Sequence, residues 1–298
     1  MEKSNAKSKE LKALISLIDE PDSNIYEEIQ QKICSIGISA IPELELAWEN
    51  FLEPYLQKRI EILIKIIQFE NVQLELNNWM KFGTKNLLLG WIIISKYQYP
   101  NLKEEEIKTQ IEQIKQDIWL ELNNDLTALE KVRIINHVFY DVYGFAGNTS
   151  SFHAPQNSFI NNVLESKKGN PLSLGIIYSI IAQSLDFPIY GVNLPEHFVL
   201  AYTNNKGNDN ISFVKTNEVL FYLNPFKKGI VFSQNEISAF LNELKLPINE
   251  TFTKPCSNVD ILIRLFNNLI YSYKELGSKN KIEELKQLLR ILKKEENH

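Results

Sequence analysis

Cysteine is scarce in this sequence: Cys34 and Cys256 are the only two among 298 residues. They stand far apart, form no CxxC pair, and share no Cys/His spacing typical of a zinc site. A disulfide between them is the less favoured alternative, and we expect two buried free thiols. This cysteine usage argues against a disulfide-stabilised secreted domain and favours a reducing, cytoplasmic compartment.

Long apolar runs and glycine- or proline-rich linkers are also lacking. The most apolar stretch, 87–94, lies between Lys85 and Lys96, which is too short for a membrane span of about 20 residues. Glycine and proline each occur only 11 times, so no long flexible linker is expected. The first residues are polar and do not form a signal-peptide pattern. We therefore expect no membrane partner.

Clustered positive charge is the third absence. The formal net charge is −5 and the calculated pI is about 5.6. Basic residues mostly alternate with acidic ones, as solvated helix faces do. Binding to nucleic acid requires clustered Lys or Arg to neutralise phosphates, so we expect no nucleic-acid partner.

Helical periodicity dominates both ends of the chain. Apolar residues such as Leu11, Leu14 and Ile18 recur at helical spacing through 1–125. They predict short antiparallel helices in a HEAT-like region that lacks a visible repeat period. Two further amphipathic stretches in 251–298, separated by a Gly-Ser turn, predict a TPR-like hairpin that packs on the rest of the chain.

The central part, 126–250, combines predicted helices with predicted strands. A helix over 129–139 and a turn-rich loop precede a buried helix over 174–184, and β-branched and aromatic runs separated by Asn and Gly follow. The expected fold class is α+β and predominantly helical, with a small antiparallel sheet in the core. The runs predict strands over 189–192, 197–202, 211–214 and 219–223.

A candidate site follows from the order of three elements. The segment 169–175 opens the buried helix, His197 begins an alternating strand, and Asn224 ends another. Papain-like and transglutaminase-like folds assemble their Cys, His and Asp or Asn in this order. A nucleophile at a helix start is stabilised by the helix dipole and by free N–H groups. No Cys stands at this helix start.

Several ordered motifs carry a family resemblance. Together they resemble the SirB-type transglutaminase-like proteins of bacteria, in which a helical region precedes a transglutaminase-like core and a TPR-like helical pair often follows. The resemblance covers roughly residues 10 to 295 and is strongest from 145 to 230. Its motifs are Gly147-Asn148, Asn157–Asn161, Gly169–Leu174, Pro195–Phe198, and Asn224–Phe226 with Gly229.

The resemblance implies the fold but no settled reaction, because this family generally lacks the nucleophilic Cys. Pro171 then stands where the thiol would be, and it has no nucleophilic side chain. Asn224 replaces the usual Asp, a change that does not by itself abolish catalysis. The candidate catalytic residues are Ser173, His197 and Asn224, and the candidate pocket residues are Asn148, Asn157, Asn170, Pro171, Glu196 and Phe226.

Each candidate also has a purely structural interpretation. Ser173 can satisfy N–H groups of the first helical turn, and loop Asn residues such as Asn148 and Asn157 often form Asx turns. His197 can be a buried histidine that bonds Asn224. The spacing of His137, His153 and His197 matches no metal-ligand pattern, so we expect neither a metal nor a cofactor.

Two functions remain open. The favoured one is a non-catalytic transglutaminase-like protein that binds a protein or peptide partner through the ancestral cleft. The alternative is a hydrolase or acyltransferase that uses Ser173, His197 and Asn224 and requires the Ser173 hydroxyl within hydrogen-bonding reach of His197. A weaker third possibility, implied by the family resemblance alone, is an indirect regulator of transcription.

Overall fold

The computed structural model describes residues 2–204, 218–246, 249 and 252–293. The chain forms two compact units, residues 1–76 and 77–298. The expected division into 1–125, 126–250 and 251–298 stays a prediction. The strand predicted over 211–214 lies outside the described residues, as does most of the Asn-Gly loop before it.

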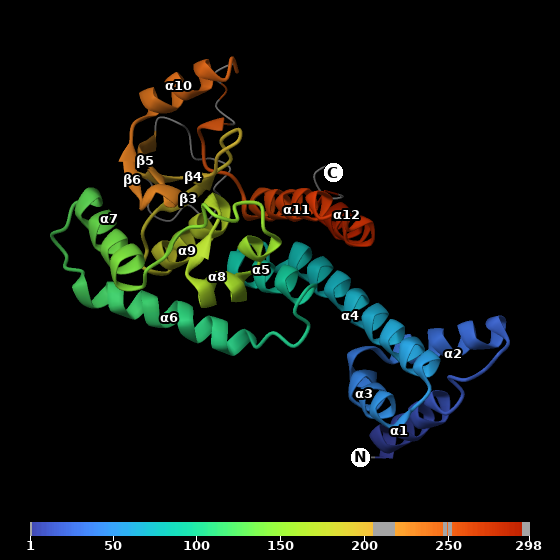
Figure 1. The fold of residues 1–298 in the computed structure, drawn as a ribbon. Helices are drawn as coiled ribbons and strands as arrows, with labels where there is room; N and C mark the ends of the chain where they lie inside the picture. The colour runs from blue at the N-terminus through green and yellow to red at the C-terminus, as the bar shows by residue number, and fades with distance from the viewer. Residues whose placement is uncertain (1, 205–217, 247–248, 250–251, 294–298) are drawn as a thin grey trace. The chain divides into compact units, whose positions relative to one another are not determined.

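The first unit is helical throughout its regular elements (Figure 1). Asp22 caps the second helix, since its Oδ1 accepts hydrogen bonds from the N–H groups of Asn24 and Ile25 at 2.8 and 3.3 Å. Gly37, with a φ of 72°, ends this helix. Isoleucine and leucine side chains from all of its helices form one core. The elements are α1 (Glu2–Ile15), α2 (Ser23–Ile36), the 3-10 turn η1 (Gly37–Ala40), α3 (Ile41–Asn50) and the first part of α4 (Pro54–Phe82).

The second unit contains the end of α4, a small sheet, and helices before, within and after it (Figure 1). Its helices are α5 (Leu87–Lys96), α6 (Glu104–Glu121), α7 (Ala128–Asn136), α8 (Ile160–Ser166), α9 (Pro171–Ser184), α10 (Gln234–Glu243), α11 (Asn258–Glu275) and α12 (Lys279–Lys293). Its short helical turns are the π-helix η2 (His137–Val142) and the 3-10 turns η3 (Pro155–Ser158) and η6 (Pro225–Lys227).

The main sheet is antiparallel, with strand order β3-β4-β5-β6. Gly191 pairs with Leu200, and Ala201 with Tyr222. A second, parallel pair joins β1 to β2 and brings the loop after Gly147 next to the start of α9. The strands are β1 (Ala146–Gly147), β2 (Lys168–Gly169), β3 (Ile189–Val192), β4 (Val199–Thr203), β5 (Val219–Asn224) and β6 (Ile230–Phe232).

Helix α9 is the centre of this unit. It is buried almost all round, as its nearly continuous apolar sequence predicts, and it packs against β3, β4 and η6. Two polar side chains fasten the turn after β5: Tyr140 donates to the carbonyl of Pro225 at 2.9 Å, and Asn136 donates to that of Gly229 at 3.0 Å. Gly229 has a φ of 67° and faces the Asn136 side chain closely, so no other residue fits there.

The C-terminal helices α11 and α12 form the predicted hairpin, with Gly277 at its turn. Hydrogen bonds connect it to the end of α5, where Tyr97 donates to Glu284 at 2.6 Å and Tyr273 donates to Gln98 at 3.0 Å. The predicted packing of this hairpin on the rest of the chain therefore has a specific polar basis.

The fold confirms the expected α+β, predominantly helical class with a small antiparallel sheet. Among the described residues, no helix has both the length and the apolar content that a membrane crossing requires.

Candidate functional site

A cleft of about 690 Å³ opens at the N-terminus of α9. The helix start forms one part of its lining, the segment before β4 another, the loop after β1 a third, and α11 the fourth. The lining residues are Phe152, His153, Asn170, Pro171, Leu172, Glu196, Phe198, Arg264, Asn268, Tyr271 and Ser272. Three of the candidate pocket residues, Asn170, Pro171 and Glu196, are therefore in this cleft.

The start of α9 is a complete capping box. Asn170 is the N-cap, and its Oδ1 accepts from the backbone N–H of Ser173 at 2.9 Å. The Ser173 hydroxyl accepts from the N–H of Asn170 at 3.0 Å and contacts its carbonyl at 3.1 Å. Ser173 is fully buried. Its hydroxyl is thus used in the cap, as the structural interpretation of this residue predicts.

Pro171 follows the N-cap at the first helical position, where a missing N–H costs nothing and a fixed φ suits the helix. It lines the cleft and has no hydrogen-bonding or nucleophilic side-chain atom. A cysteine substituted at this position would test the environment that the helix start offers to a thiol.

His197 lies in the loop before β4, because the strand begins at Val199 rather than at His197 as expected. Glu196, with a φ of 59°, turns the backbone just before it. The imidazole is partly exposed and packs against the Phe240 ring of α10, with 4.9 Å between the ring centroids. The turn at Glu196 breaks the alternation on which the predicted direction of His197 depended.

Asn224 ends β5 and caps the η6 turn. Its Oδ1 accepts from the N–H groups of Phe226 and Lys227 at 3.0 and 3.1 Å. Among the described residues, no hydrogen bond joins the side chains of Ser173, His197 and Asn224. Each instead bonds or packs with other residues, so the described contacts do not link the three candidate catalytic side chains.

We expect the His197 imidazole to titrate below the ordinary histidine value of about 6.5. Burial lowers the pKa of His197, Glu196 opposes this shift, and Arg264 and Lys227 add to it. The fold therefore favours the neutral ring. The associated stability is present above about pH 6.5 and is lost as the pH falls through the lowered pKa of the folded state. Carbon-13 NMR of the His197 ring measures this midpoint.

The matched variants for this titration are Phe240→Ala, which removes the ring that packs on His197, and Trp119→Ala, which removes an exposed aromatic ring of α6. Phe240→Ala should raise the midpoint because the imidazole becomes more hydrated, and Trp119→Ala should leave it unchanged. A wild-type midpoint at or above 6.5 would contradict the described environment of His197.

Asn148 and Asn157 hold the loop after β1 in shape rather than lining the cleft. Asn148 donates from its side-chain amide to Asn157 Oδ1 at 2.9 Å, and Asn157 donates to the carbonyls of Ser151 and Phe152 at 2.7 and 3.0 Å. Local side-chain bonds of this kind are the typical use of Asn in loops. They position Phe152 and His153, which do line the cleft.

Phe226 also packs against the loop after β1. Its ring contacts Phe152 edge to face, with 5.6 Å between centroids, and it occupies the space beside Gly147. A Cβ on Gly147 would lie 2.5 Å from this ring. Phe226 is thus a packing partner of the loop and lies outside the cleft lining.

The aromatic contacts continue across the cleft. His153 lies between Phe152 and Tyr271, with 5.0 Å between its ring centroid and each of theirs. Phe152 and Tyr271 remain 42% and 48% exposed. The site therefore has an exposed aromatic rim, a feature common at protein-binding surfaces.

Four residues of α11 line the cleft, and none of them was a candidate from the sequence: Arg264, Asn268, Tyr271 and Ser272. The available signal was the charge of Arg264, the only charged residue in the apolar stretch 261–273. Its Nη1 donates to the carbonyl of Leu194 at 3.0 Å and to Asn193 Oδ1 at 3.4 Å. Burial lowers the pKa of Arg264, although an arginine stays charged at neutral pH.

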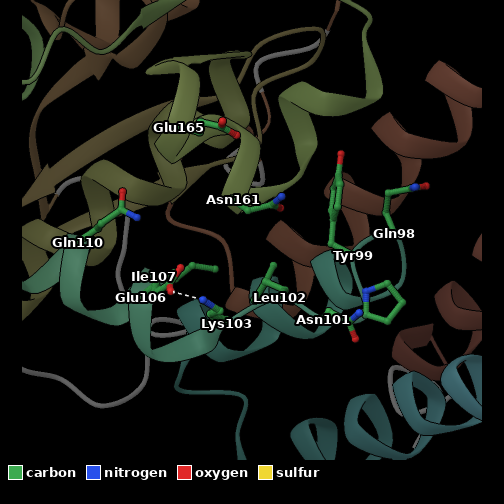
Figure 2. Close-up of a pocket in the computed structure, with 11 residues that line it drawn as sticks. Gln98, Tyr99, Asn101, Leu102, Lys103, Glu106, Ile107, Gln110, Asn161 and Glu165 are labelled. Atoms are coloured by element: carbon green, nitrogen blue, oxygen red, sulfur yellow. Dashed lines mark hydrogen bonds and ion pairs between the residues drawn. The ribbon is translucent and has the colours of Figure 1, made fainter. Parts of the chain in front are cut away.

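A second cavity, of about 580 Å³, lies along the segment 98–103, the first half of α6 and α8 (Figure 2). Lys103 and Glu106 form an ion pair at 2.8 Å on its wall. The Oδ1 of Asn161 has no hydrogen-bond partner among the described residues, but this atom is itself buried. None of the candidate catalytic or pocket residues lines this cavity.

The described histidines and acidic residues do not converge on a metal site. His137 contacts Asp141 at 3.6 Å, His153 contacts the rings of Phe152 and Tyr271 at steep angles, and His197 packs on Phe240. Within the described part of the chain, no group of three His, Cys, Asp or Glu side chains could hold a metal ion.

The two cysteines are free and half-buried rather than fully buried. Cys256 is the one in the second unit, and its Sγ contacts the carbonyl of Gly191 at 3.2 Å. Burial raises the pKa of Cys256 to about 12, so its thiol is protonated at neutral pH. It is not a displaced substitute for the missing nucleophile.

Comparison with known proteins identifies a relationship for this region. The sequence profile described as transglutaminase-like superfamily matches residues 105–267. A UPF0162 protein of Vibrio cholerae is 27% identical over 179 residues, which are 60% of this chain and 62% of that protein. A UPF0162 protein of Xylella fastidiosa is 28% identical over 133 residues, 43% of this chain and 47% of that protein.

A eukaryotic protein also matches part of the chain. Human F-box only protein 21 is 26% identical over 156 residues, which are 52% of this chain and 23% of that protein. The chain matches less than two thirds of the length of each of these relatives. No solved structure gives a significant match.

Proposed function

The chain belongs to the transglutaminase-like superfamily, and from this premise we propose that it is a SirB-type, non-catalytic member that binds a peptide segment of a partner protein. The binding site is the cleft at the start of α9. The proposal combines a retained cleft with a helix start that offers no nucleophile.

One observation supports the proposal: the polar side chains at the helix start form the hydrogen bonds of its capping box. Pro171 has no reactive atom, and the Ser173 hydroxyl is buried and bonded to Asn170 on both sides. A serine nucleophile needs a base within about 2.6 to 3.2 Å. His197 instead packs on Phe240. Loss of a nucleophile removes far more catalysis than loss of an orienting group.

Three properties of the cleft support peptide binding. A volume of about 690 Å³ is within the usual range of ligand clefts, roughly 300 to 1,000 Å³. Its exposed rings, Phe152 and Tyr271, can bury apolar surface of a partner, and Arg264 adds a charged donor. Aromatic residues and Arg are the side chains that most often dominate binding energy at protein interfaces.

The two free thiols support a reducing location for this activity. Burial raises the pKa of Cys34 to about 11 and that of Cys256 to about 12, and both cysteines are free. We place the protein in the cytoplasm on this basis.

Catalysis is tested with activated esters and with a glutamine peptide plus an amine. We expect the same background turnover from the wild-type protein, Ser173→Ala and His197→Ala, because neither side chain contacts the other. Ser173→Ala should lower the stability of the fold by about 1 kcal/mol through loss of the capping box. Turnover that either substitution abolishes in a folded protein would establish the hydrolase or acyltransferase alternative.

Binding is tested with pools of short, fluorescein-labelled peptides of scanned sequence, read by anisotropy. Tyr271→Ala should weaken binding of the selected peptides, whereas Trp119→Ala, which removes a 64% exposed ring on α6, should not. If no pool binds, or if substitutions in the cleft leave the affinity for peptide unchanged, the proposed function is wrong.

A further inference from the structure

The geometry points to recognition of a carboxylate in the bound segment, and we propose that the Arg264 side chain binds it. This inference rests on the proposed peptide-binding function and names the chemical group that the cleft selects. The carboxylate is either the C-terminus of the partner or an acidic side chain within it.

The guanidinium of Arg264 is held in place by hydrogen bonds from Nη1, while its other nitrogen donors stay available within the described part of the chain. Nη1 is held by the Leu194 carbonyl and by Asn193 Oδ1, at 3.0 and 3.4 Å. Among the described residues, neither Nε nor Nη2 has a hydrogen-bond acceptor, and no carboxylate lies within 4.0 Å of this side chain. Nε and Nη2 form the edge of a guanidinium that accepts a carboxylate through two parallel hydrogen bonds.

Arg264 carries its positive charge at a partly buried position beside the cleft. The residue is half-buried on α11 and lines the cleft. The ring of Phe198 lies near it, with 5.8 Å from the guanidinium carbon to the ring centroid. A charge that is partly removed from water and has no ionic partner costs stability. A ligand carboxylate would supply the missing partner, so the uncompensated charge favours binding of an anion.

The rest of the cleft limits which anion fits. The positive end of the α9 dipole faces the same cleft at Pro171 and Leu172 and favours negative charge. Glu196 also lines the cleft and disfavours a second negative group close by. A single carboxylate accompanied by N–H donors meets both conditions, and a peptide carries both. A polyphosphate or a strongly acidic segment does not.

The test uses acetyl-capped peptides chosen from the selected pools in matched forms. One form has a free C-terminal carboxylate, one a C-terminal amide, and one an amide with an internal glutamate. Binding to the full chain is measured by calorimetry, and the nitrogen-15 signal of Arg264 Nε is followed by NMR. A carboxylate form should bind roughly 10- to 100-fold more tightly than the neutral amide and should shift this signal.

Arg264→Gln should remove the preference for the carboxylate form, and Arg264→Lys should retain only a salt-sensitive part of it, because lysine cannot form the paired bonds. Arg290→Gln, on the exposed surface of α12, is the matched control and should bind like the wild type. Melting temperatures establish that each variant is folded.

The outcomes separate the two proposals. If peptides bind in a Tyr271-dependent manner but the neutral amide binds as well as the carboxylate forms, the carboxylate inference is wrong and peptide binding stands. The carboxylate inference is also wrong if Arg264→Gln leaves the preference for the carboxylate forms intact. If no peptide form binds at all, both proposals fail. A preference for the free C-terminus over internal glutamate, or the reverse, identifies the source of the carboxylate.

Discussion

Phe198→Ala is expected to lower the free energy of unfolding of the unit 77–298 by about 3 to 5 kcal/mol. The ring is 2% exposed and fills a slot between α9 and β3 that two glycines create. A Cβ on Gly175 would lie 2.7 Å from the ring, and one on Gly191 2.5 Å. Because both sides of the slot are backbone, the neighbours cannot collapse into the space that alanine leaves, and the cavity term stays large.

The measurement is urea unfolding followed by tryptophan fluorescence, since Trp79, Trp91 and Trp119 all belong to this unit. Phe82→Ala is the matched control: this ring is 87% exposed at the end of α4, and its loss should change stability by no more than about 0.5 kcal/mol. A loss below about 1 kcal/mol for Phe198→Ala would mean that the ring does not occupy the glycine slot.

Phe198 also connects stability to the cleft, because the same ring lines it beside Arg264. Within the motif 195–198, the exposed His197 is therefore followed by a buried residue that shapes the cleft. The motif places a buried phenylalanine whose fixed position defines one wall of the cleft. The histidine itself points to α10. The part of the motif that matters most for the described structure is thus the ring and not the imidazole.

Elements with a strong local signal could be predicted from the sequence. Helix α9 was expected from its apolar run and from a turn with Asn170 and Pro171 at its start, and the structure places the N-cap at Asn170. The α11–α12 hairpin was expected from two amphipathic stretches around Gly277. In these segments the periodicity, the cap and the burial all indicate the same structure.

The short strand β6 and the directions of His197 and Asn224 could not be predicted in this way. β6 is three residues long and largely exposed, so its side chains show no alternation. Asn224 can bond either a histidine or its own turn, and the N–H groups of the next residues are closer in the chain. Local hydrogen bonds of this kind compete with a long-range partner that the sequence cannot place.

The cleft could be predicted only in part, because its lining comes from segments more than 100 residues apart. Asn170 and Pro171 belong to a recognisable motif, whereas Tyr271 and Arg264 lie in a helix whose sequence mainly indicates core packing. Which residues of α11 meet the start of α9 depends on how the hairpin packs. That information resides in contacts spread over the whole unit, such as the bond between Tyr97 and Glu284.

Pro171→Cys is expected to create a thiol that reacts with iodoacetamide on the order of a hundredfold faster than Cys256 does. A thiol at a helix start has a pKa of about 8.5 or lower, whereas that of Cys256 is raised to about 12. The larger thiolate fraction outweighs the weaker nucleophilicity of the more acidic thiol. The Asn170 cap is retained, and the first helical position tolerates residues other than proline. Mass spectrometry of the labelled peptides gives both rates in one sample.

Ser184→Cys is the control for this variant, because Ser184 is exposed at the opposite end of the same helix. The negative end of the dipole raises the pKa of a thiol there, so this cysteine should react more slowly than the one at position 171. Equal and slow labelling of position 171 and Cys256 would show that the helix start is closed to solvent. That result would also remove the basis for a binding cleft at α9. Fast labelling would mean that the fold still provides the environment of a thiol nucleophile. The proposed lack of catalysis would then be attributed to Pro171 together with the imidazole of His197, which packs on Phe240.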